Sequence, residues 1–146
     1  MGFRTLGAGD RAALTRLFRD VFTQEPWNDD WSDRTQLDAY IDDLTGQNNS
    51  LTLGYFEGGR LVGLSMGHEK HWHTGPEYLI DEFSVEPSSQ GRGVGTEFLR
   101  LIGNYLKERG IHHIFLLTDR TVPAFDFYRK NGFRELKDSV SFVKTL

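Results

Sequence analysis

The sequence predicts an α/β fold (α+β type) in which a mixed central β-sheet of about seven strands is flanked by four helices. Three observations predict it. Short segments bounded by glycine, proline or asparagine alternate apolar and polar residues, which is typical of strands. Other segments repeat apolar residues three and four positions apart, as amphipathic helices do. The order strand, glycine-rich turn, helix occurs around Gln90–Gly95, so the two kinds of element are mixed along the chain.

The N-terminal half is expected to hold a strand, two helices and a hairpin. The helices are indicated by apolar stripes that follow Asp10, and Ser32 or Asp33, as N-cap residues. The hairpin turns at Gly58-Gly59. In chain order we expect a strand over Phe3–Leu6, a helix from Asp10 to Phe22, an irregular segment over Thr23–Asp33, a helix to about Leu44, and strands over Leu51–Phe56 and Arg60–His68, the last continuing toward His73.

The C-terminal half is expected to alternate strands and helices. Pro123 suits the first turn of a helix and Gly132 its end. The continuous apolar character of Ile111–Thr118 indicates a buried strand. In chain order we expect a strand over Tyr78–Val85, a helix from about Gly93 to Arg109, the Ile111–Thr118 strand, a helix over Pro123–Lys130, and closing strands over Phe133–Leu136 and Val140–Val143.

Composition limits the class of protein. A chain of 146 residues with 38% apolar and 13% aromatic content suits one domain over residues 1–146. The lack of cysteine excludes disulfide scaffolds, thiolate zinc sites and cysteine nucleophiles. Neither a signal peptide nor an apolar run of membrane-span length is evident, so we expect a cytoplasmic protein without a membrane partner. The net charge of −4 argues against nucleic acid as a partner.

The turn Gln90–Gly95 is a candidate anion site. It follows a strand and precedes a helix, which brings backbone N–H groups and the positive end of a helix dipole to one point. Glycines remove the Cβ atoms that would keep an anion from the amides, and Arg92 adds a charge. The turn lacks the lysine of a P-loop and lies too late for a dinucleotide fingerprint. The alternative is that its glycines serve packing alone.

Two segments resemble a known family. Gln90–Gly95 matches the Gln/Arg-x-x-Gly-x-Gly/Ala signature of the GNAT superfamily of acyl-CoA-dependent N-acetyltransferases, and Ala124–Phe133 is similar to that family's Ala-x-x-Phe-Tyr-x-x-x-Gly-Phe segment. The resemblance spans nearly the whole chain and is strongest over residues 78–133. It implies the GNAT fold, with acetyl-CoA as cosubstrate.

The resemblance also implies where acetyl-CoA binds. Backbone amides around Val85 and Gly91–Gly95 would hold the pantetheine arm and the pyrophosphate. The family's asparagine seven residues before the helix tyrosine is Thr121 here, which leaves one hydroxyl for that contact. The expected cofactor-binding residues are Phe83, Val85, Gln90, Gly91, Arg92, Gly93, Val94, Gly95, Thr96, Thr121, Ala124 and Phe127.

Tyr128 is the expected catalytic acid. Acetyl transfer requires that the amine lose a proton, that the carbonyl oxygen be stabilised and that the leaving thiolate be protonated. Tyr128 resembles the family's tyrosine that donates a proton to the CoA sulfur. A phenol with a pKa of about 10 stays protonated at neutral pH, as a donor must. The alternative is that Tyr128 is a packed helix aromatic beside Phe125 and Phe127.

Asp81 and Glu82 are the candidate bases. Strict alternation puts Asp81 on the face of Phe83 and Val85, and Glu82 on the other. The strand resembles the acid-acid-Phe-Phe-Val strand of polyamine acetyltransferases, and some aminoglycoside 6′-acetyltransferases have an acid at the Asp81 position. We expect Asp81 to take the amine proton, directly or through water, with Glu82 second. A salt bridge to an arginine is the structural alternative.

An acidic segment indicates the acceptor. Residues 20–43 hold eight acids and one base, Arg34. The resemblance places this segment beside the acceptor pocket, where an aromatic and acidic wall would bind a cation through charge and cation–π contact. The expected members are Glu25, Trp27, Asp29, Asp30 and Trp31. The alternative is an exposed acidic loop with its tryptophans in the core.

The predicted function is transfer of an acetyl group from acetyl-CoA to a small cationic amine, polyamine- or aminoglycoside-like, in a ternary complex. The alternatives are a protein lysine or N-terminal acetyltransferase and a non-catalytic acyl-CoA sensor. His71 and His73 would point the same way on a strand, but no third ligand is evident, so no metal is expected. By analogy with the family, a homodimer pairing its C-terminal strands is expected.

Overall fold

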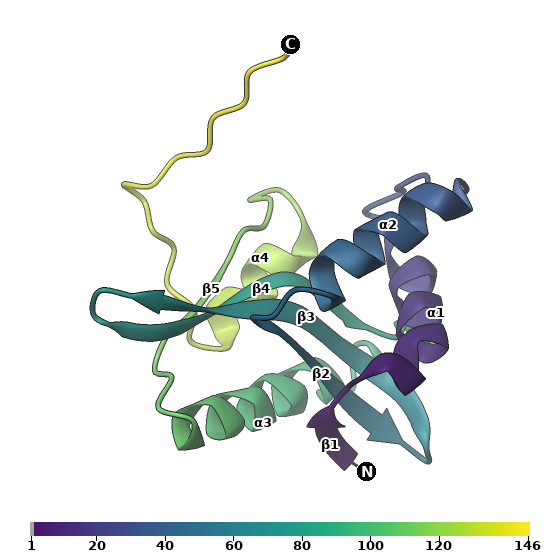
Figure 1. Cartoon of the computed structure of the whole chain (residues 1–146), viewed down its shortest axis with the longest axis horizontal. Coiled ribbons are helices and arrows are strands. Elements are labelled where there is room, and N and C mark those ends of the chain that lie inside the picture. Colours follow the sequence, from purple (N-terminus) through teal and green to yellow (C-terminus); the bar gives the residue numbers. More distant parts are fainter. Residues whose placement is uncertain (1) are drawn as a thin grey trace.

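The computed structural model describes residues 2–146, and its centre is a mixed five-stranded sheet in the order β1-β2-β3-β4-β5. The first four strands pair antiparallel in sequence order, and β5 joins β4 in parallel (Figure 1). The strands are β1 (Gly2–Thr5), β2 (Ser50–Glu57), β3 (Arg60–Trp72), β4 (Gly75–Val85) and β5 (Ile114–Leu116).

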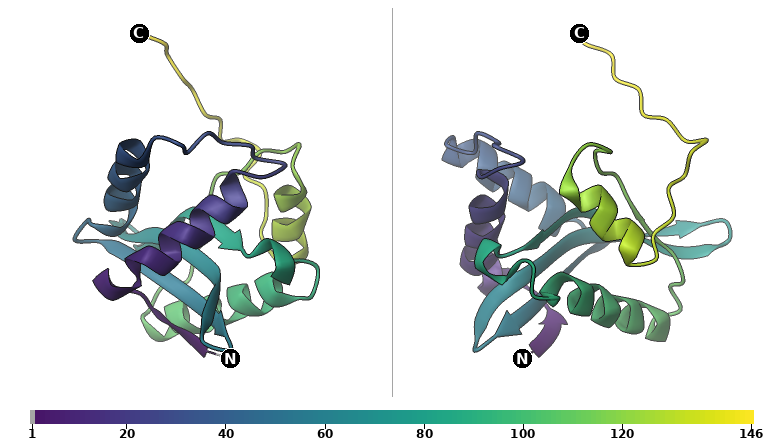
Figure 2. Two further views of the ribbon diagram at one scale, coloured as in Figure 1. Left: turned by 90° about the vertical axis from the view of Figure 1, so that its right-hand side faces the viewer. Right: turned by 180° about the vertical axis from the view of Figure 1, so that it is seen from behind.

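Within residues 2–146, four α-helices flank this sheet, as the apolar stripes predicted. They are α1 (Arg11–Phe22), α2 (Arg34–Thr45), α3 (Val94–Glu108) and α4 (Pro123–Lys130), with short 3-10 turns at Ala8–Asp10 and Pro87–Ser89. Figure 2 shows α1 and α2 on one face of the sheet and α3 and α4 on the other. Within residues 2–146 no helix is both long enough and apolar enough to cross a membrane.

Each face of the sheet has its own apolar core. Leu17, Phe18 and Leu37 bury the stripes of α1 and α2 against β3. On the other face, Phe98 and Ile102 of α3 are fully buried against β2 and β4. Burying one such side chain stabilises the fold by about 1.5–3 kcal/mol. The sheet is therefore packed on both faces, with residues of β4 held between the two cores.

The two predicted N-caps behave differently. Asp33 caps α2, because its Oδ1 accepts a hydrogen bond from the Gln36 N–H at 3.2 Å. Asp10 occupies the N-cap position of α1, but its carboxylate accepts from the Arg4 guanidinium and from the Gly7 N–H instead. Asp10 therefore ties β1 to the start of the helix rather than capping it.

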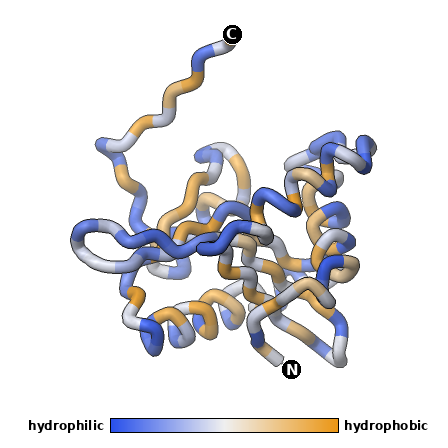
Figure 3. The backbone as a smooth tube through the Cα atoms, viewed as in Figure 1, coloured by the Kyte–Doolittle hydropathy of each residue, from blue (hydrophilic) through white to orange (hydrophobic). Residues whose placement is uncertain are grey.

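The prediction of about seven strands was wrong by two. Phe133–Leu136 and Val140–Val143 form no strands, and β5 is shorter than expected. Figures 1 and 3 show the C-terminal segment leaving the body as an extended tail with apolar residues along it. Val140, Phe142 and Val143 are 72%, 94% and 95% exposed. Alternation makes a segment competent for pairing, but a strand also needs a partner edge, and the tail pairs with none among the described residues.

A β-bulge interrupts β4 at Asp81. Met66 pairs with Glu82 and Gly67 with Ile80, so Asp81 is the extra residue on β4. A Cβ on Gly67 would lie 2.4 Å from the Leu79 carbonyl oxygen, so the close approach of the two backbones here requires glycine. Because the bulge adds one residue, the alternation predicted for the two acids does not hold across it.

Candidate functional site

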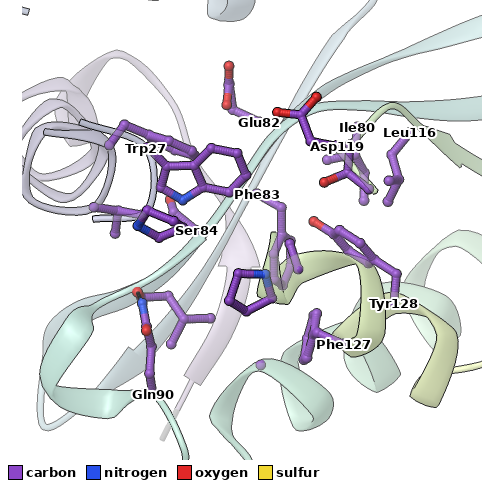
Figure 4. Close-up of a pocket in the computed structure, with 18 of the residues that line it drawn as sticks. Trp27, Ile80, Glu82, Phe83, Ser84, Gln90, Leu116, Asp119, Phe127 and Tyr128 are labelled. Atoms are coloured by element: carbon purple, nitrogen blue, oxygen red, sulfur yellow. Dashed lines mark hydrogen bonds between the residues drawn. The ribbon is translucent and has the colours of Figure 1, made fainter. Parts of the chain in front are cut away.

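A pocket of about 910 Å³ lies where β4 and β5 separate. Its walls come from the segment between α1 and α2, from β4, from the residues after β5, from the start of α3 and from α4. Figure 4 shows Trp27 and Tyr128 on opposite sides of Phe83 within it. This volume is typical of a site for a small molecule or a cosubstrate arm.

The pocket exposes one edge of β4. Strands β4 and β5 pair only over Tyr78–Ile80 and Ile114–Leu116, although β4 continues to Val85. Asp81–Val85 therefore lines the pocket with an edge that β5 does not cover. An extended ligand with amide groups can pair with such an edge as an added strand does.

The glycine-rich turn closes one end of the pocket. Gly91 and Gly93 have φ values of 77° and 79°, which glycine adopts without steric cost. Gly93 is the N-cap of α3, and no side chain in the described part of the chain caps the first turn of that helix. The first amides of a helix without such a cap are left to bind an anion. The turn and its helix therefore fit a pyrophosphate.

Other residues expected at the cosubstrate site have different places. Gln90 lines the pocket, but its Nε2 donates to the Val85 carbonyl at 2.9 Å and so ties the turn to the end of β4. Arg92 is outside the lining and pairs with Glu57 at 3.3 Å. Val94 is buried in the core, and Thr121 does not line the pocket. The remaining expected residues do line it: Phe83, Val85, Gly91, Gly93, Gly95, Thr96, Ala124 and Phe127.

Tyr128 projects from α4 into this pocket (Figure 4). Its ring lies edge-on to Phe83, Phe127 and Phe133, with centroid separations of 6.1, 5.3 and 5.3 Å. Burial, and then the negative charge of Glu82, raise the pKa of the Tyr128 phenol above its ordinary value. The hydroxyl therefore stays protonated over the physiological range, as a proton donor requires.

Glu82 lines the pocket beside Tyr40 of α2. The Tyr40 hydroxyl donates to Glu82 Oε1 at 2.7 Å. Burial raises the pKa of Glu82, the nearby Asp29 and Asp81 raise it further, and the hydrogen bond from Tyr40 lowers it. A carboxylate with a raised pKa is a stronger base than an exposed one.

Asp81 also lines the pocket and has a different partner. Its Oδ2 lies 2.9 Å from His68 Nδ1 on β3, and both side chains are about one-third exposed. Neither Asp81 nor Glu82 pairs with an arginine in the part of the chain that the structure describes. The salt bridge considered from sequence is therefore not formed.

The expected acceptor wall is divided in two. Glu25, Trp27 and Asp29 line the pocket. Asp30 does not; its carboxylate accepts from the Ser32 N–H at 3.0 Å in a local turn. Trp31 lies behind the wall, stacked on Tyr40 at 5.1 Å and packed against Phe18.

Sequence reasoning missed several pocket residues. Asp119 lines the pocket just beyond the C-terminal end of β5, and its place after a parallel strand is the signal in the sequence that points to it. Ser84 lines it from β4, buried, with a hydroxyl that has no partner among residues 2–146. Ser141 of the tail also reaches the pocket. No pattern in the sequence indicates a role for Ser141.

The lining is strongly acidic. It contains five carboxylates, whereas lysine, arginine and histidine are missing from it within the described chain. No group of three or more His, Cys, Asp or Glu side chains among residues 2–146 is arranged to hold a metal ion. The five carboxylates are Glu25, Asp29, Asp81, Glu82 and Asp119.

The comparison with protein families identifies the domain. The model of the acetyltransferase (GNAT) family matches residues 11–133. The chain belongs to this family. The GNAT match covers the pocket walls from α1 to the end of α4, so the resemblance noted at Gln90–Gly95 and Ala124–Phe133 is confirmed.

Individual relatives are similar over different lengths. The chain is 30% identical over 76 residues to streptothricin acetyltransferase of Streptomyces lavendulae, covering 51% of this chain but 39% of the relative. It is 30% identical over 137 residues to the N-alpha-acetyltransferase RimI of Mycobacterium tuberculosis, covering 90% of this chain and 79% of the relative. The chain therefore matches most of the length of RimI, but less than half of the length of streptothricin acetyltransferase.

The fold also matches a solved GNAT structure. An aminoglycoside acetyltransferase from an uncultured soil metagenomic sample, meta-AAC0020 in complex with sisomicin, superposes with a TM-score of 0.76 at 22% identity. The superposition covers 99% of this chain and 95% of that one. At this identity the match establishes a shared fold.

Proposed function

We propose that this GNAT domain transfers an acetyl group from acetyl-CoA to a primary amine of a small acceptor with more than one positive charge, polyamine- or aminoglycoside-like. The observation that supports this acceptor class most directly is a lining that holds five carboxylates and, among residues 2–146, no positive side chain. A cleft of one sign of charge concentrates ligands of the opposite sign. Trp27 adds an aromatic surface for cation–π contact.

The cosubstrate side rests on the exposed β4 edge and the glycine-rich turn. The pantetheine amides would pair with Asp81–Val85, and the pyrophosphate would bind the amides from Gly91 to Gly95. The thioester would then lie between β4 and α4, beside Tyr128. In this arrangement the acceptor enters from the side of Glu25 and Asp29.

The proposed reaction uses Glu82 as the base and Tyr128 as the acid, on opposite walls of the pocket. Glu82 takes a proton from the acceptor ammonium, so that the neutral amine attacks the thioester carbonyl carbon. As the new C–N bond forms, the C–S bond breaks and the thiolate leaves with the proton of the Tyr128 hydroxyl. The new amide nitrogen then loses its second proton to the Tyr128 oxygen, which restores the hydroxyl, and Glu82 releases its proton to solvent. We favour Glu82 over Asp81 as the base for two reasons. Burial raises the pKa of Glu82, and the negative charge of Glu82 raises the pKa of the Tyr128 hydroxyl.

The test is free-thiol release from acetyl-CoA by the purified protein across polyamines, aminoglycosides, amino acids and peptides. Turnover with an acceptor of two or more positive charges, and a lower kcat/KM for its monoamine counterpart, is the expected result. Isothermal titration with CoA provides an independent measurement of cosubstrate binding. CoA binding without turnover on any acceptor would contradict the enzyme and favour an acyl-CoA sensor.

A second acceptor class is favoured by one comparison. The N-alpha-acetyltransferase RimI is similar to 90% of this chain, over 79% of its own length. A protein N-terminus therefore belongs in the acceptor panel, as does a lysine peptide. Faster turnover of an uncharged N-terminal peptide than of any polycation would overturn the small cationic acceptor.

We also propose a homodimer formed through the C-terminal tail. The outer edge of β5 has no paired strand in the described chain. The tail segment with alternating apolar residues is free of contacts that would bury it within residues 2–146, because Val140, Phe142 and Val143 are exposed. Ser141 of the same tail reaches the pocket. Light scattering should give twice the chain mass, and Phe142→Lys should give a monomer; a monomeric wild-type protein at micromolar concentration would refute the dimer.

A further inference from the structure

We propose that Tyr40, on α2, is a positioning residue that holds the Glu82 carboxylate for removal of the acceptor proton. The inference rests on the proposed function in assigning Glu82 as the base. Its geometric basis is the contact between the Tyr40 hydroxyl and Glu82 Oε1, at 2.7 Å. The two residues are 42 positions apart in the sequence, and this hydrogen bond joins α2 to β4, the strand between β3 and β5 in the sheet.

Tyr40 is itself held from two sides. Its ring is stacked on Trp31, with centroids 5.1 Å apart and planes inclined by 15°. Phe18 of α1 packs against both rings, at 5.8 Å from Tyr40 and 5.5 Å from Trp31. Aromatic pairs at these separations attract one another beyond the effect of their burial. The hydroxyl is therefore presented to Glu82 from a fixed ring.

This arrangement also gives Trp31 a role that the sequence did not indicate. Trp31 was expected to contact the acceptor, but it lies behind the pocket wall and contacts Tyr40 instead. The segment between α1 and α2 thus contributes to the site twice. Trp27 and Asp29 face the pocket, and Trp31 supports the residue that binds Glu82.

The groups that face Glu82 come from four places. Tyr40 donates from α2, Asp29 lies in the segment after α1, Asp81 precedes Glu82 on β4, and Tyr128 faces it from α4. Burial and the two aspartates favour the protonated carboxyl, whereas the hydrogen bond from Tyr40 favours the carboxylate. Of the four, Tyr40 is the group that keeps Glu82 available as a base.

The opposing influences on the pKa of Glu82 determine how Tyr40→Phe should change the pH dependence of kcat/KM. A base acts in its deprotonated form, so kcat/KM falls on the acid side as Glu82 becomes protonated. Removing a donor to the carboxylate raises its pKa. Tyr40→Phe keeps the ring on Trp31 and removes the hydroxyl alone, so the acid limb of the kcat/KM profile should move upward by about one pH unit. Well above that limb, kcat/KM should approach the wild-type value.

Tyr105→Phe is the matched control. Tyr105 lies on α3, where its ring packs against Phe3 at 5.7 Å, and it does not line the pocket. The same loss of a phenolic hydroxyl there should leave the acid limb in place. Equal loss of kcat/KM at every pH in Tyr40→Phe, or an unshifted limb, would overturn the positioning role.

A titration without acceptor separates this inference from the proposed function. Side-chain carboxyl resonances of 13C-labelled glutamate, with Glu82 assigned from the Glu82→Gln variant, report the pKa of Glu82 directly. Tyr40→Phe should raise that pKa by about one unit, and Tyr105→Phe should not change it. An unchanged Glu82 titration in Tyr40→Phe refutes the inference whether or not the protein turns over. A shifted titration with an unshifted kcat/KM limb shows that Glu82 is not the base.

Discussion

Gly95 lies directly against the ring of Phe127, so that a Cβ on Gly95 would stand 2.9 Å from Phe127 Cζ. Phe127 is stacked on Phe83 at 5.9 Å and lies edge-on to Tyr128 at 5.3 Å. The start of α3 therefore touches an aromatic row that leads to the proposed catalytic acid. Gly95 is required for this close approach and not for its backbone conformation, because it lies inside the helix.

Gly95→Val should weaken CoA binding by about tenfold, because the added methyl groups displace the Phe127 ring into the cosubstrate end of the pocket. The measurement is the Kd for CoA by isothermal titration. Gly103→Val on the same helix is the control, since a Cβ there meets nothing within 4 Å. Equal CoA affinity in Gly95→Val and Gly103→Val would contradict the placement of CoA beside Gly95.

Gly93→Ala tests the turn itself. A residue other than glycine at its φ of 79° costs about 1 kcal/mol. Relief of this strain would move the backbone amides that are proposed to bind pyrophosphate. We expect a severalfold weaker Kd for CoA together with a lower melting temperature. Gly110→Ala carries the same strain at the far end of α3, with φ 77°. It should lower the melting temperature and leave the Kd unchanged; parallel losses of CoA affinity would show that the Gly93 effect is one of stability.

Tyr128→Phe should lower kcat by about a hundredfold or more while CoA affinity stays at the wild-type value, because it removes a proton donor and keeps the ring that packs on Phe83. Steady-state kinetics and CoA titration on one preparation measure both quantities. The raised pKa of Tyr128 predicts further that wild-type kcat shows no basic limb below pH 10 from this group. Full kcat in Tyr128→Phe would remove Tyr128 as the acid.

Asp29 and Asp30 form a matched pair for testing the acceptor wall, because they are neighbours in sequence and Asp29 alone faces the pocket. Asp29→Asn should raise KM for a polycationic acceptor about fivefold, as expected for one screened charge contact of about 1 kcal/mol. Added salt should shrink the difference. Asp30→Asn, at the local turn with Ser32, should leave KM unchanged. Equal effects of the two variants on KM would indicate that the acceptor responds to the overall negative charge of the surface and not to a direct contact with Asp29.

What the sequence could predict was local. Gln90–Gly95 and Ala124–Phe133 are contiguous, so their residue types and spacing indicate a strand–turn–helix and a helix before any tertiary contact is known. Asp33 as a cap and Gly58-Gly59 as a turn depend on local backbone chemistry in the same way, and both are confirmed.

What the sequence could not predict depends on partners elsewhere in the chain. The bulge at Asp81 lies where Gly67, on the neighbouring strand, leaves no room for a Cβ beside the Tyr78 ring and the Leu79 carbonyl. The hydrogen bond between Tyr40 and Glu82 spans 42 positions. At Val140–Val143 the sequence predicted a strand that does not form. The alternation is present in the sequence, but alternation alone does not supply a neighbouring strand edge for pairing.

Glu86 provides a prediction on folding stability. It follows β4 immediately, and its carboxylate is buried between the guanidinium groups of Arg60 and Arg16, so it ties the β2–β3 hairpin and α1 to the end of β4. The hydrogen bonds and charge of Arg60, with those of Arg16, lower the pKa of Glu86 below its ordinary value. Glu86→Gln should reduce the free energy of unfolding at neutral pH by about 1–3 kcal/mol, measured by urea denaturation.

The pH dependence of that loss follows from the direction of the shift. A depressed pKa means that the stabilisation is fully present above the unfolded-state pKa, about 4.3, and is lost as the pH falls through the lower folded-state value. The difference between wild type and Glu86→Gln should therefore be constant above about pH 5 and should shrink below about pH 4.3. Glu97→Gln, which removes an exposed pair with Arg100, should show a smaller difference throughout, because solvent screens such pairs. A difference for Glu86→Gln that grows as the pH falls would contradict this assignment.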